Sequence, residues 1–179
     1  MDIKIREGSE GDAGFVAWTV LTALDMDDAH LQEMTEVCAD PKSMYSWKNS
    51  LIAEMDGRPA GCLVSYPGSD YLRMREYTWP KLWATPEDLR VEVNPPETVP
   101  GEYYLDSMAI VPEARGKEIG HRLMTAAMER GKSLGIGRFS LIVDVGKPRL
   151  REYYAALGFR PVGDCPFFGH LYTRMQLDV

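Results

Sequence analysis

The pattern of apolar and polar positions divides the first third of the chain into short strands and amphipathic helices. Apolar and charged residues alternate over 3–6, which predicts a strand, and apolar residues then recur at helical spacing over 15–22. The acidic stretch 25–40 fits a second, less regular helix. Two apolar runs within 51–66 lie on either side of a turn that contains Gly57, so they predict a β-hairpin.

The second half of the chain alternates strands with helices. The pattern predicts strands over 103–111, 139–145, 159–162 and 171–177, and helices over 119–134 and 148–157. The last of these helices begins at Pro148 and is followed by Gly158, as backbone chemistry favours. This order of elements predicts a mixed α/β (α+β) fold with helices flanking a central sheet.

Residues 67–100 are the least regular stretch. They contain six prolines, together with Trp79, Trp83 and several tyrosines, and only a short helix around 70–77 fits them. A structureless loop of that length is unusual inside a compact domain. The aromatic content therefore favours an ordered, packed insert.

Composition narrows the class of protein. The 179 residues are 45% hydrophobic and carry a net charge of −7, which fits one globular domain spanning 1–179 and argues against nucleic acid as a partner. No apolar run is long enough for a membrane span, and the alternating start differs from a signal peptide, so we expect a cytoplasmic protein. The three cysteines lack metal-site spacing, so we expect them to be buried, with no metal.

The segment Arg115-Gly116-Lys117-Glu118-Ile119-Gly120 carries the clearest chemical signal. It joins a predicted strand to a predicted helix, where free N–H groups and the helix dipole favour a phosphate group. Arg115 and Lys117 add positive charge. The alternative is an ordinary loop with two solvated basic residues.

This segment lies in a run, 105–124, that resembles the central motif of the GNAT superfamily of acyl-CoA-dependent N-acetyltransferases. The motif is Gln or Arg, two residues, Gly, one residue, then Gly or Ala, and Arg115 and Gly120 match its ends. Residues 153–159 resemble the family's second signature, an aromatic residue and Tyr followed after three residues by Gly-Phe. The order and spacing of the two blocks make the resemblance specific.

Two residues depart from the family pattern. Glu118 replaces the middle glycine and brings a carboxylate near the expected pyrophosphate. Lys147 stands where the family often has an Asn that contacts the pantetheine arm; it could reach a CoA phosphate or have no role. Glu118 is the main support for an alternative function, a non-catalytic acyl-CoA-binding or sensor protein with the same fold.

The resemblance implies a mostly antiparallel sheet, splayed at the strand before the pyrophosphate loop, and an enzyme that transfers acetyl from acetyl-CoA to a primary amine in a ternary complex. It implies that backbone groups of Met108, Ala109 and Ile110 bind the pantetheine arm, with the Met108 N–H facing the thioester oxygen. The remaining cofactor-binding residues it implies are Arg115, Gly116, Lys117, Glu118, Ile119, Gly120, His121, Lys147 and Tyr154.

Acetyl transfer to an amine also needs a proton donor and a base. The resemblance assigns the donor to Tyr154, and we expect Tyr153 to pack in the core. For the base, strand alternation places Asp106 on the face of Met108, two residues before the oxyanion donor. Tyr104, Glu102 or a water relay are the alternatives.

The acceptor side is expected at the first helices and the insert 67–100. The acidic cluster Asp25, Asp27 and Asp28 could attract a cationic amine, although a solvated face is the simpler interpretation. We expect His121 to be exposed, and His170 could line the acceptor cleft. The amine is not identified, and a homodimer through an exposed strand edge is one alternative for the oligomeric state.

Overall fold

The computed structural model describes all residues from 1 to 179. The strands are β1 (Ile3–Glu7), β2 (Ser50–Met55), β3 (Arg58–Pro67), β4 (Tyr103–Ile110), β5 (Arg138–Asp144), β6 (Arg160–Phe167) and β7 (His170–Asp178). The helices are α1 (Ala13–Ala23), α2 (Leu31–Ala39), α3 (Tyr71–Thr78), α4 (Ile119–Ser133) and α5 (Pro148–Ala156). Short 3-10 helices cover Glu10–Asp12, Asp28–His30, Trp47–Asn49, Gly68–Asp70, Trp79–Lys81 and Pro112–Ala114.

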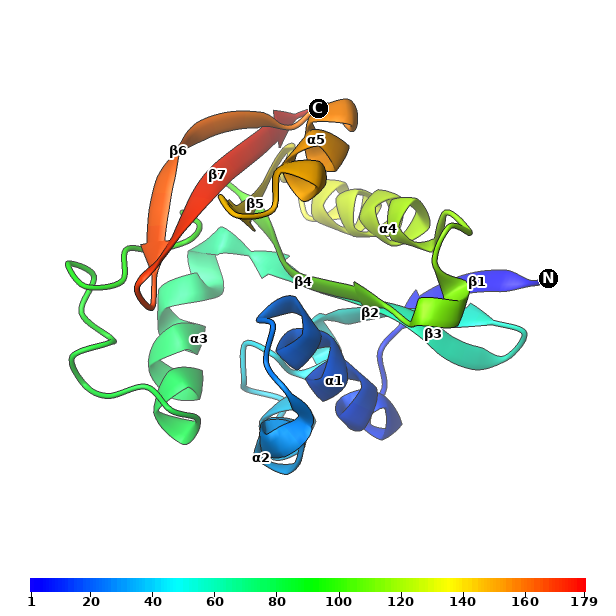
Figure 1. The fold of residues 1–179 in the computed structure, drawn as a ribbon, viewed down its shortest axis with the longest axis horizontal. Coiled ribbons are helices and arrows are strands. Elements are labelled where there is room, and N and C mark those ends of the chain that lie inside the picture. Colours follow the sequence, from blue (N-terminus) through cyan, green and yellow to red (C-terminus); the bar gives the residue numbers. More distant parts are fainter.

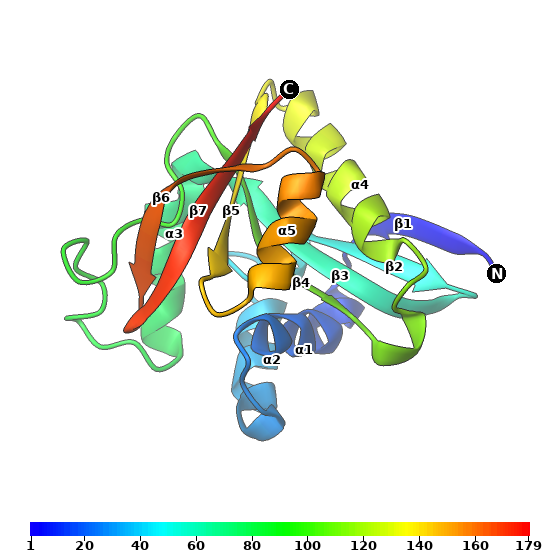
Figure 2. The same cartoon turned by 45° about the horizontal axis from the view of Figure 1, so that its top comes forward.

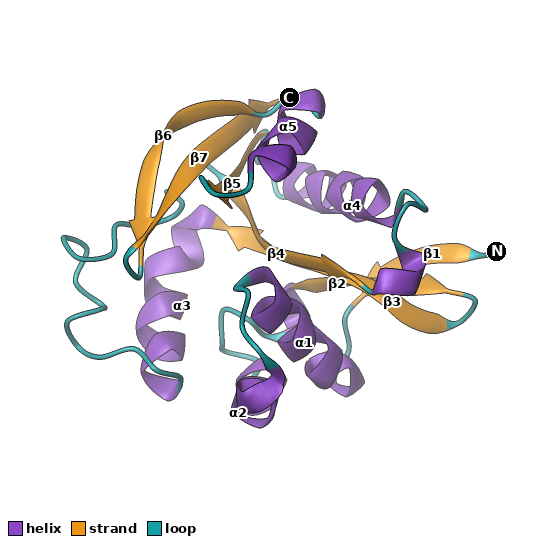
Figure 3. Ribbon diagram, in the orientation of Figure 1, coloured by secondary structure: helices purple, strands orange, loops and turns teal.

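The strands form one seven-stranded sheet in the order β1-β2-β3-β4-β5-β7-β6. Helices α1, α2 and α3 cover one face of it, and α4 and α5 lie on the other side (Figures 1 and 3). Each face has its own apolar core, one with α1–α3 and one with α4 and α5. Every neighbouring strand pair is antiparallel except β4 and β5, so the expected mixed, mostly antiparallel sheet with flanking helices is confirmed.

The sheet splays at its centre. Strands β4 and β5 run parallel and pair only at their first residues, Tyr103 with Phe139 and Tyr104 with Ser140. Beyond Tyr104 the two strands diverge beneath α5, as Figure 2 shows. One edge of β4 is therefore left without a neighbouring strand in the middle of the molecule, and this confirms the splay expected before the loop 115–120.

Strand β4 also contains a β-bulge. Residues 64 and 65 are neighbours on β3, but their partners on β4, Ser107 and Leu105, are two residues apart. Asp106 is the extra residue between them. A bulge of this kind bends the strand and redirects the side chains that follow it.

The bulge reverses the alternation of side chains along β4. Before it, Tyr104 packs in the core beneath α1–α3; after it, Met108 and Ile110 pack with the core on the α4 side. Asp106 stays on the first side, where Tyr66 donates a hydrogen bond to it. The expectation that Asp106 shares a face with Met108 is therefore wrong, because simple alternation takes no account of an inserted residue.

Several predicted elements differ in their ends. The helix expected within 25–40 is a 3-10 turn at Asp28–His30 followed by α2, and the strand expected over 159–162 extends to Phe167. The short helix around 70–77 is confirmed as α3. All three cysteines are free and buried, as expected. No helix is long and apolar enough to cross a membrane.

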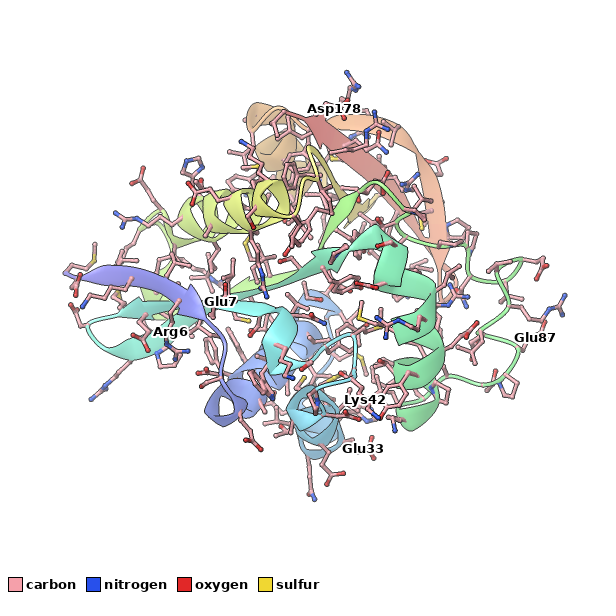
Figure 4. All side chains as sticks on the ribbon, turned by 180° about the vertical axis from the view of Figure 1, so that it is seen from behind. Arg6, Glu7, Glu33, Lys42, Glu87 and Asp178 are labelled. Atoms are coloured by element: carbon pink, nitrogen blue, oxygen red, sulfur yellow. The ribbon has the colours of Figure 1, made fainter.

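The insert is ordered by a buried arginine. After α3 the chain has no long element until β4, and Glu87, labelled in Figure 4, extends into solvent from this loop. Arg75 of α3 is 1% exposed and donates to two carbonyl oxygens of the loop, that of Leu89 at 2.6 Å and that of Asn94 at 2.7 Å. Its guanidinium also stacks 4.6 Å from the Trp79 ring. These contacts fix the path that leads to Glu97.

Candidate active site

The loop between β4 and α4 presents a row of free backbone donors. The N–H groups of residues 116–121 donate to no backbone or side-chain acceptor, and intrahelical bonding resumes where the Arg122 N–H donates to the Glu118 carbonyl at 3.0 Å. Six consecutive donors at a helix N-terminus, together with the dipole of the 15-residue α4, form a site suited to a phosphate group.

Glu118 directs its side chain into solvent from a left-handed backbone. Its φ is +60°, a conformation that favours glycine, and it makes no ion pair or side-chain hydrogen bond. Gly116, two residues earlier, also has a positive φ of +73°. The two positive-φ residues shape a tight turn that exposes the loop's N–H groups. Glu118 can therefore coexist with an anion bound to the backbone.

The basic side chains of the loop fold back onto it. The Lys117 ammonium donates to the Glu113 carbonyl at 3.0 Å, and the Arg115 guanidinium lies 3.4 Å from the Ile110 carbonyl. Both charges remain beside the free N–H groups. His121 is exposed, as expected, and lines an open groove between β1 and α4.

Two tyrosines of α5 flank the same region, and Tyr153 is the more exposed of the two. Tyr154 is 9% exposed and packs edge-on against Tyr153 and Phe159, whereas Tyr153 is 37% exposed. A Cβ at Gly120 would lie 3.4 Å from the Tyr153 hydroxyl, so that hydroxyl lies over the first turn of α4. The expectation that Tyr153 belongs to the core is wrong, because α5 sits at the rim and turns Tyr154 inward.

The Tyr154 hydroxyl has chemistry suited to a proton donor. It makes no hydrogen bond to another protein group, yet it is not among the fully enclosed polar atoms that lack a partner. Burial raises the pKa of Tyr154 well above its ordinary value. The group therefore stays protonated at neutral pH.

Asp106 lies at the bulge, on the side of the sheet that α1–α3 cover. Its carboxylate accepts hydrogen bonds from the Tyr66 hydroxyl and, at 2.9 Å, from the Ser107 hydroxyl. Burial raises the pKa of Asp106 to about 6, although both hydrogen bonds oppose the shift. A carboxylate with this pKa is largely ionised at pH 7 and is a better proton acceptor than an exposed aspartate.

A second buried carboxylate, Glu97, comes from the insert. It is 5% exposed, and it accepts hydrogen bonds from Tyr71 at 2.6 Å and Tyr104 at 2.9 Å. Burial, followed by the negative charge of Asp106, raises the pKa of Glu97 to about 8. Sequence reasoning missed this residue. In the sequence, Glu97 is simply an acidic residue between Pro96 and Thr98, in a stretch with no periodic pattern that would indicate burial.

The two carboxylates share a small cavity. It has a volume of about 60 Å³ and lies between α1, β4 and β5, with Ile142 of β5 on its far wall. A second cavity of about 310 Å³ adjoins it toward the surface, and Leu24, Phe167 and Tyr172 line both. His170 lines the outer cavity.

Other candidates lie elsewhere. Glu102, an alternative base, is ion-paired with Arg174 at 2.9 Å and lines neither cavity, and Tyr104 donates its proton to Glu97. Lys147 forms an ion pair of 2.6 Å with Asp25, so in this structure it reaches across to the loop after α1 rather than to the loop 115–120. No cluster of His, Cys, Asp and Glu is arranged to hold a metal ion.

Comparisons with known proteins identify the family and the fold. The profile of the acetyltransferase (GNAT) family matches residues 18–159. A solved structure described as an acetyltransferase is 31% identical, with a TM-score of 0.77, over 98% of this chain and 99% of that chain. The N-acetyltransferase from Staphylococcus aureus Mu50 is 22% identical, with a TM-score of 0.81, over 97% of this chain and 100% of that chain.

A third solved structure extends the fold comparison. The polyamine N-acetyltransferase of Drosophila melanogaster, described as forming N-acetylagmatine, is 16% identical, with a TM-score of 0.61, over 99% of this chain and 100% of that chain. At such identities the likeness to the Staphylococcus and Drosophila proteins concerns the fold. None of the curated proteins compared with the chain matches it. The family profile, which covers most of the sequence, shows that the chain belongs to the GNAT family of acetyltransferases.

Proposed function

We propose that the protein transfers an acetyl group from acetyl-CoA to a primary amine by direct attack in a ternary complex. The observation that carries this proposal is the row of free N–H groups over 116–121 beside a strand edge with no neighbour. The loop would bind the CoA pyrophosphate. The open edge of β4 would pair with the pantetheine arm through the backbone of Met108, Ala109 and Ile110.

The acid pair supplies the base. An alkylammonium group with a pKa of about 10.4 must lose its proton before its lone pair can attack. Asp106 is the proposed acceptor of that proton, and Glu97, in the same cavity, shares the negative charge at neutral pH. The neutral nitrogen then forms a bond to the thioester carbonyl carbon.

Strand β4 and helix α5 supply the two groups that act on the thioester. The Met108 N–H is the proposed donor to the oxygen that gains negative charge during attack. The carbon–sulfur bond then breaks, and the CoA thiolate takes a proton from Tyr154. The nitrogen releases its second proton to solvent as the tetrahedral intermediate collapses, which leaves a neutral N-acetylamine. The proton held by Asp106 returns through solvent to Tyr154, and the products are the N-acetylamine and CoA.

The test combines turnover with binding. Release of CoA thiol from acetyl-CoA should depend on an added amine, and calorimetry should show CoA binding that is lost when phosphate contacts are screened by high salt. Binding without turnover over a broad amine panel would instead favour an acyl-CoA-binding sensor, the alternative that Glu118 suggests. Absence of CoA binding would contradict both functions.

A further inference from the structure

The acceptor side has an acidic inner end, an apolar middle and an acidic outer end. At the inner end, Asp106 and Glu97 line the 60 Å³ cavity, and a pair of acids so close holds about one negative charge near pH 7. The cavity has room for an ammonium group and little more. It is therefore the place of the reacting nitrogen.

The two cavities share a largely apolar part of their lining. Leu24, Phe167 and Tyr172 line both cavities, and no Lys or Arg side chain lines either one. A ligand that reaches from the inner to the outer cavity passes these three side chains. An unbranched alkyl chain meets that requirement, whereas a polar chain would lose its hydration there.

The outer cavity ends in further negative charge. Asp144 lines it, and so does Asp25, which forms an ion pair of 2.6 Å with Lys147; the Asp25 side chain is 65% exposed and that of Lys147 is 37% exposed. An exposed pair of this kind contributes little and is readily exchanged for another cation. Trp83 and Phe168 add aromatic faces that attract positive charge.

Strand β5 gives a length scale for a ligand that reaches both cavities. Ile142 lines the inner cavity and Asp144 the outer one, and these two residues point to the same side of the strand about 7 Å apart. Single bonds between carbon atoms are about 1.5 Å long and zigzag, so an extended alkyl chain of about five or six bonds spans the same length as this stretch of β5.

From this arrangement we infer that the acceptor is a linear alkyl diamine, with the reacting amine between Asp106 and Glu97 and a second cation at Asp144. The inference rests on the proposed acetyl transfer and gives it a substrate class. The second cation adds binding energy remote from the reacting carbonyl, so it raises kcat/KM for acetylation of the first amine.

Matched amines test the second charge. Putrescine is compared with n-butylamine and cadaverine with n-pentylamine, pairs of equal chain length that differ in the second ammonium group, and γ-aminobutyrate places an anion there instead. We expect kcat/KM to be at least about tenfold higher for each diamine than for its monoamine, and lowest for γ-aminobutyrate. Equal values for diamine and monoamine, or a preference for the anionic amine, would overturn the inference and leave acetyl transfer intact.

A variant pair locates the effect. Asp144→Asn keeps the oxygen that accepts the Gly146 N–H at 2.8 Å but loses the charge, so the diamine-to-monoamine ratio of kcat/KM should fall about tenfold. Asp164→Asn, an exposed acid on β6 that lines neither cavity, should leave the ratio unchanged. An unchanged ratio in Asp144→Asn would overturn the placement of the second cation.

Binding separates this inference from the proposed reaction. If no amine is acetylated although CoA binds, acetyl transfer is contradicted, and calorimetry of putrescine and n-butylamine with the CoA-loaded protein then decides the substrate class. Tighter binding of putrescine, reduced by Asp144→Asn, would support a diamine site. Equal binding would overturn it.

Discussion

Glu118 combines a strained backbone with an unfavourable charge at one position. Its φ of +60° costs about 1 kcal/mol that glycine avoids, and its carboxylate lies beside N–H groups proposed to bind phosphates. Glu118→Gly should therefore raise the free energy of unfolding by up to about 1 kcal/mol and tighten CoA binding several-fold. Urea denaturation and calorimetry measure the two effects.

Glu118→Gln separates strain from charge. Glutamine keeps the left-handed strain and loses the charge, so it should tighten CoA binding while leaving the unfolding free energy within about 0.5 kcal/mol of the wild type. Weaker CoA binding in both variants would show that the carboxylate helps to order the loop, contrary to this view.

Tyr154 and Tyr153 form a natural pair for testing the proton donor. Both carry a hydroxyl near the splay, but the motif and burial favour Tyr154. Tyr154→Phe should lower kcat by roughly 10²-fold or more with little change in KM for acetyl-CoA, because general acid catalysis has that magnitude. Tyr153→Phe should retain kcat within a few-fold. Unchanged turnover in Tyr154→Phe would remove this residue from the mechanism.

At the scale of elements, one buried arginine connects α3 to the proposed acceptor site. Arg75→Met fills similar space but leaves the carbonyls of Leu89 and Asn94 without their donor, so it should destabilise the fold by about 2–4 kcal/mol. Hydrogen exchange should accelerate over 82–97, and kcat/KM should fall as Glu97 loses its position. Arg73→Met on the same helix, with a side chain 70% exposed, is the control and should change stability by less than about 0.5 kcal/mol.

The sequence predicts those elements whose apolar residues follow a regular period. The hairpin, β4, α4 and α5 have clear periods, and the loop 115–120 combines a motif with a helix start. The sequence identified Asp106 as a candidate but placed its side chain on the wrong face of β4, because the bulge arises from the pairing of β4 with β3. Glu97 was missed, because its burial depends on the Arg75 contacts and on two tyrosines, Tyr71 and Tyr104, that only the fold brings together.

For the whole molecule, the buried acids should make stability depend on pH in an unusual direction. The pKa of Asp106 is raised to about 6 and that of Glu97 to about 8, so between about pH 4 and pH 8 the folded protein holds more protons than the unfolded chain. The free energy of unfolding should therefore decrease as pH rises through this window, by at most about 1.4 kcal/mol per pH unit for each retained proton. Asp12, whose pKa the hydrogen bond from Arg6 lowers to about 2, acts in the opposite sense, so stability should also fall as pH drops below about 4.

Stability should consequently be greatest near pH 4 to 5. Urea unfolding measured from pH 3 to 9 checks this maximum, and Glu97→Gln, which cannot titrate, should flatten the decline on the alkaline side while leaving the acid side unchanged. A wild-type profile that is flat from pH 5 to 8 would mean that the two acids are hydrated in solution. In that case Asp106 would titrate near its ordinary pKa and would be a weaker base for the amine proton, so the stability profile also tests the electrostatic basis of the proposed reaction.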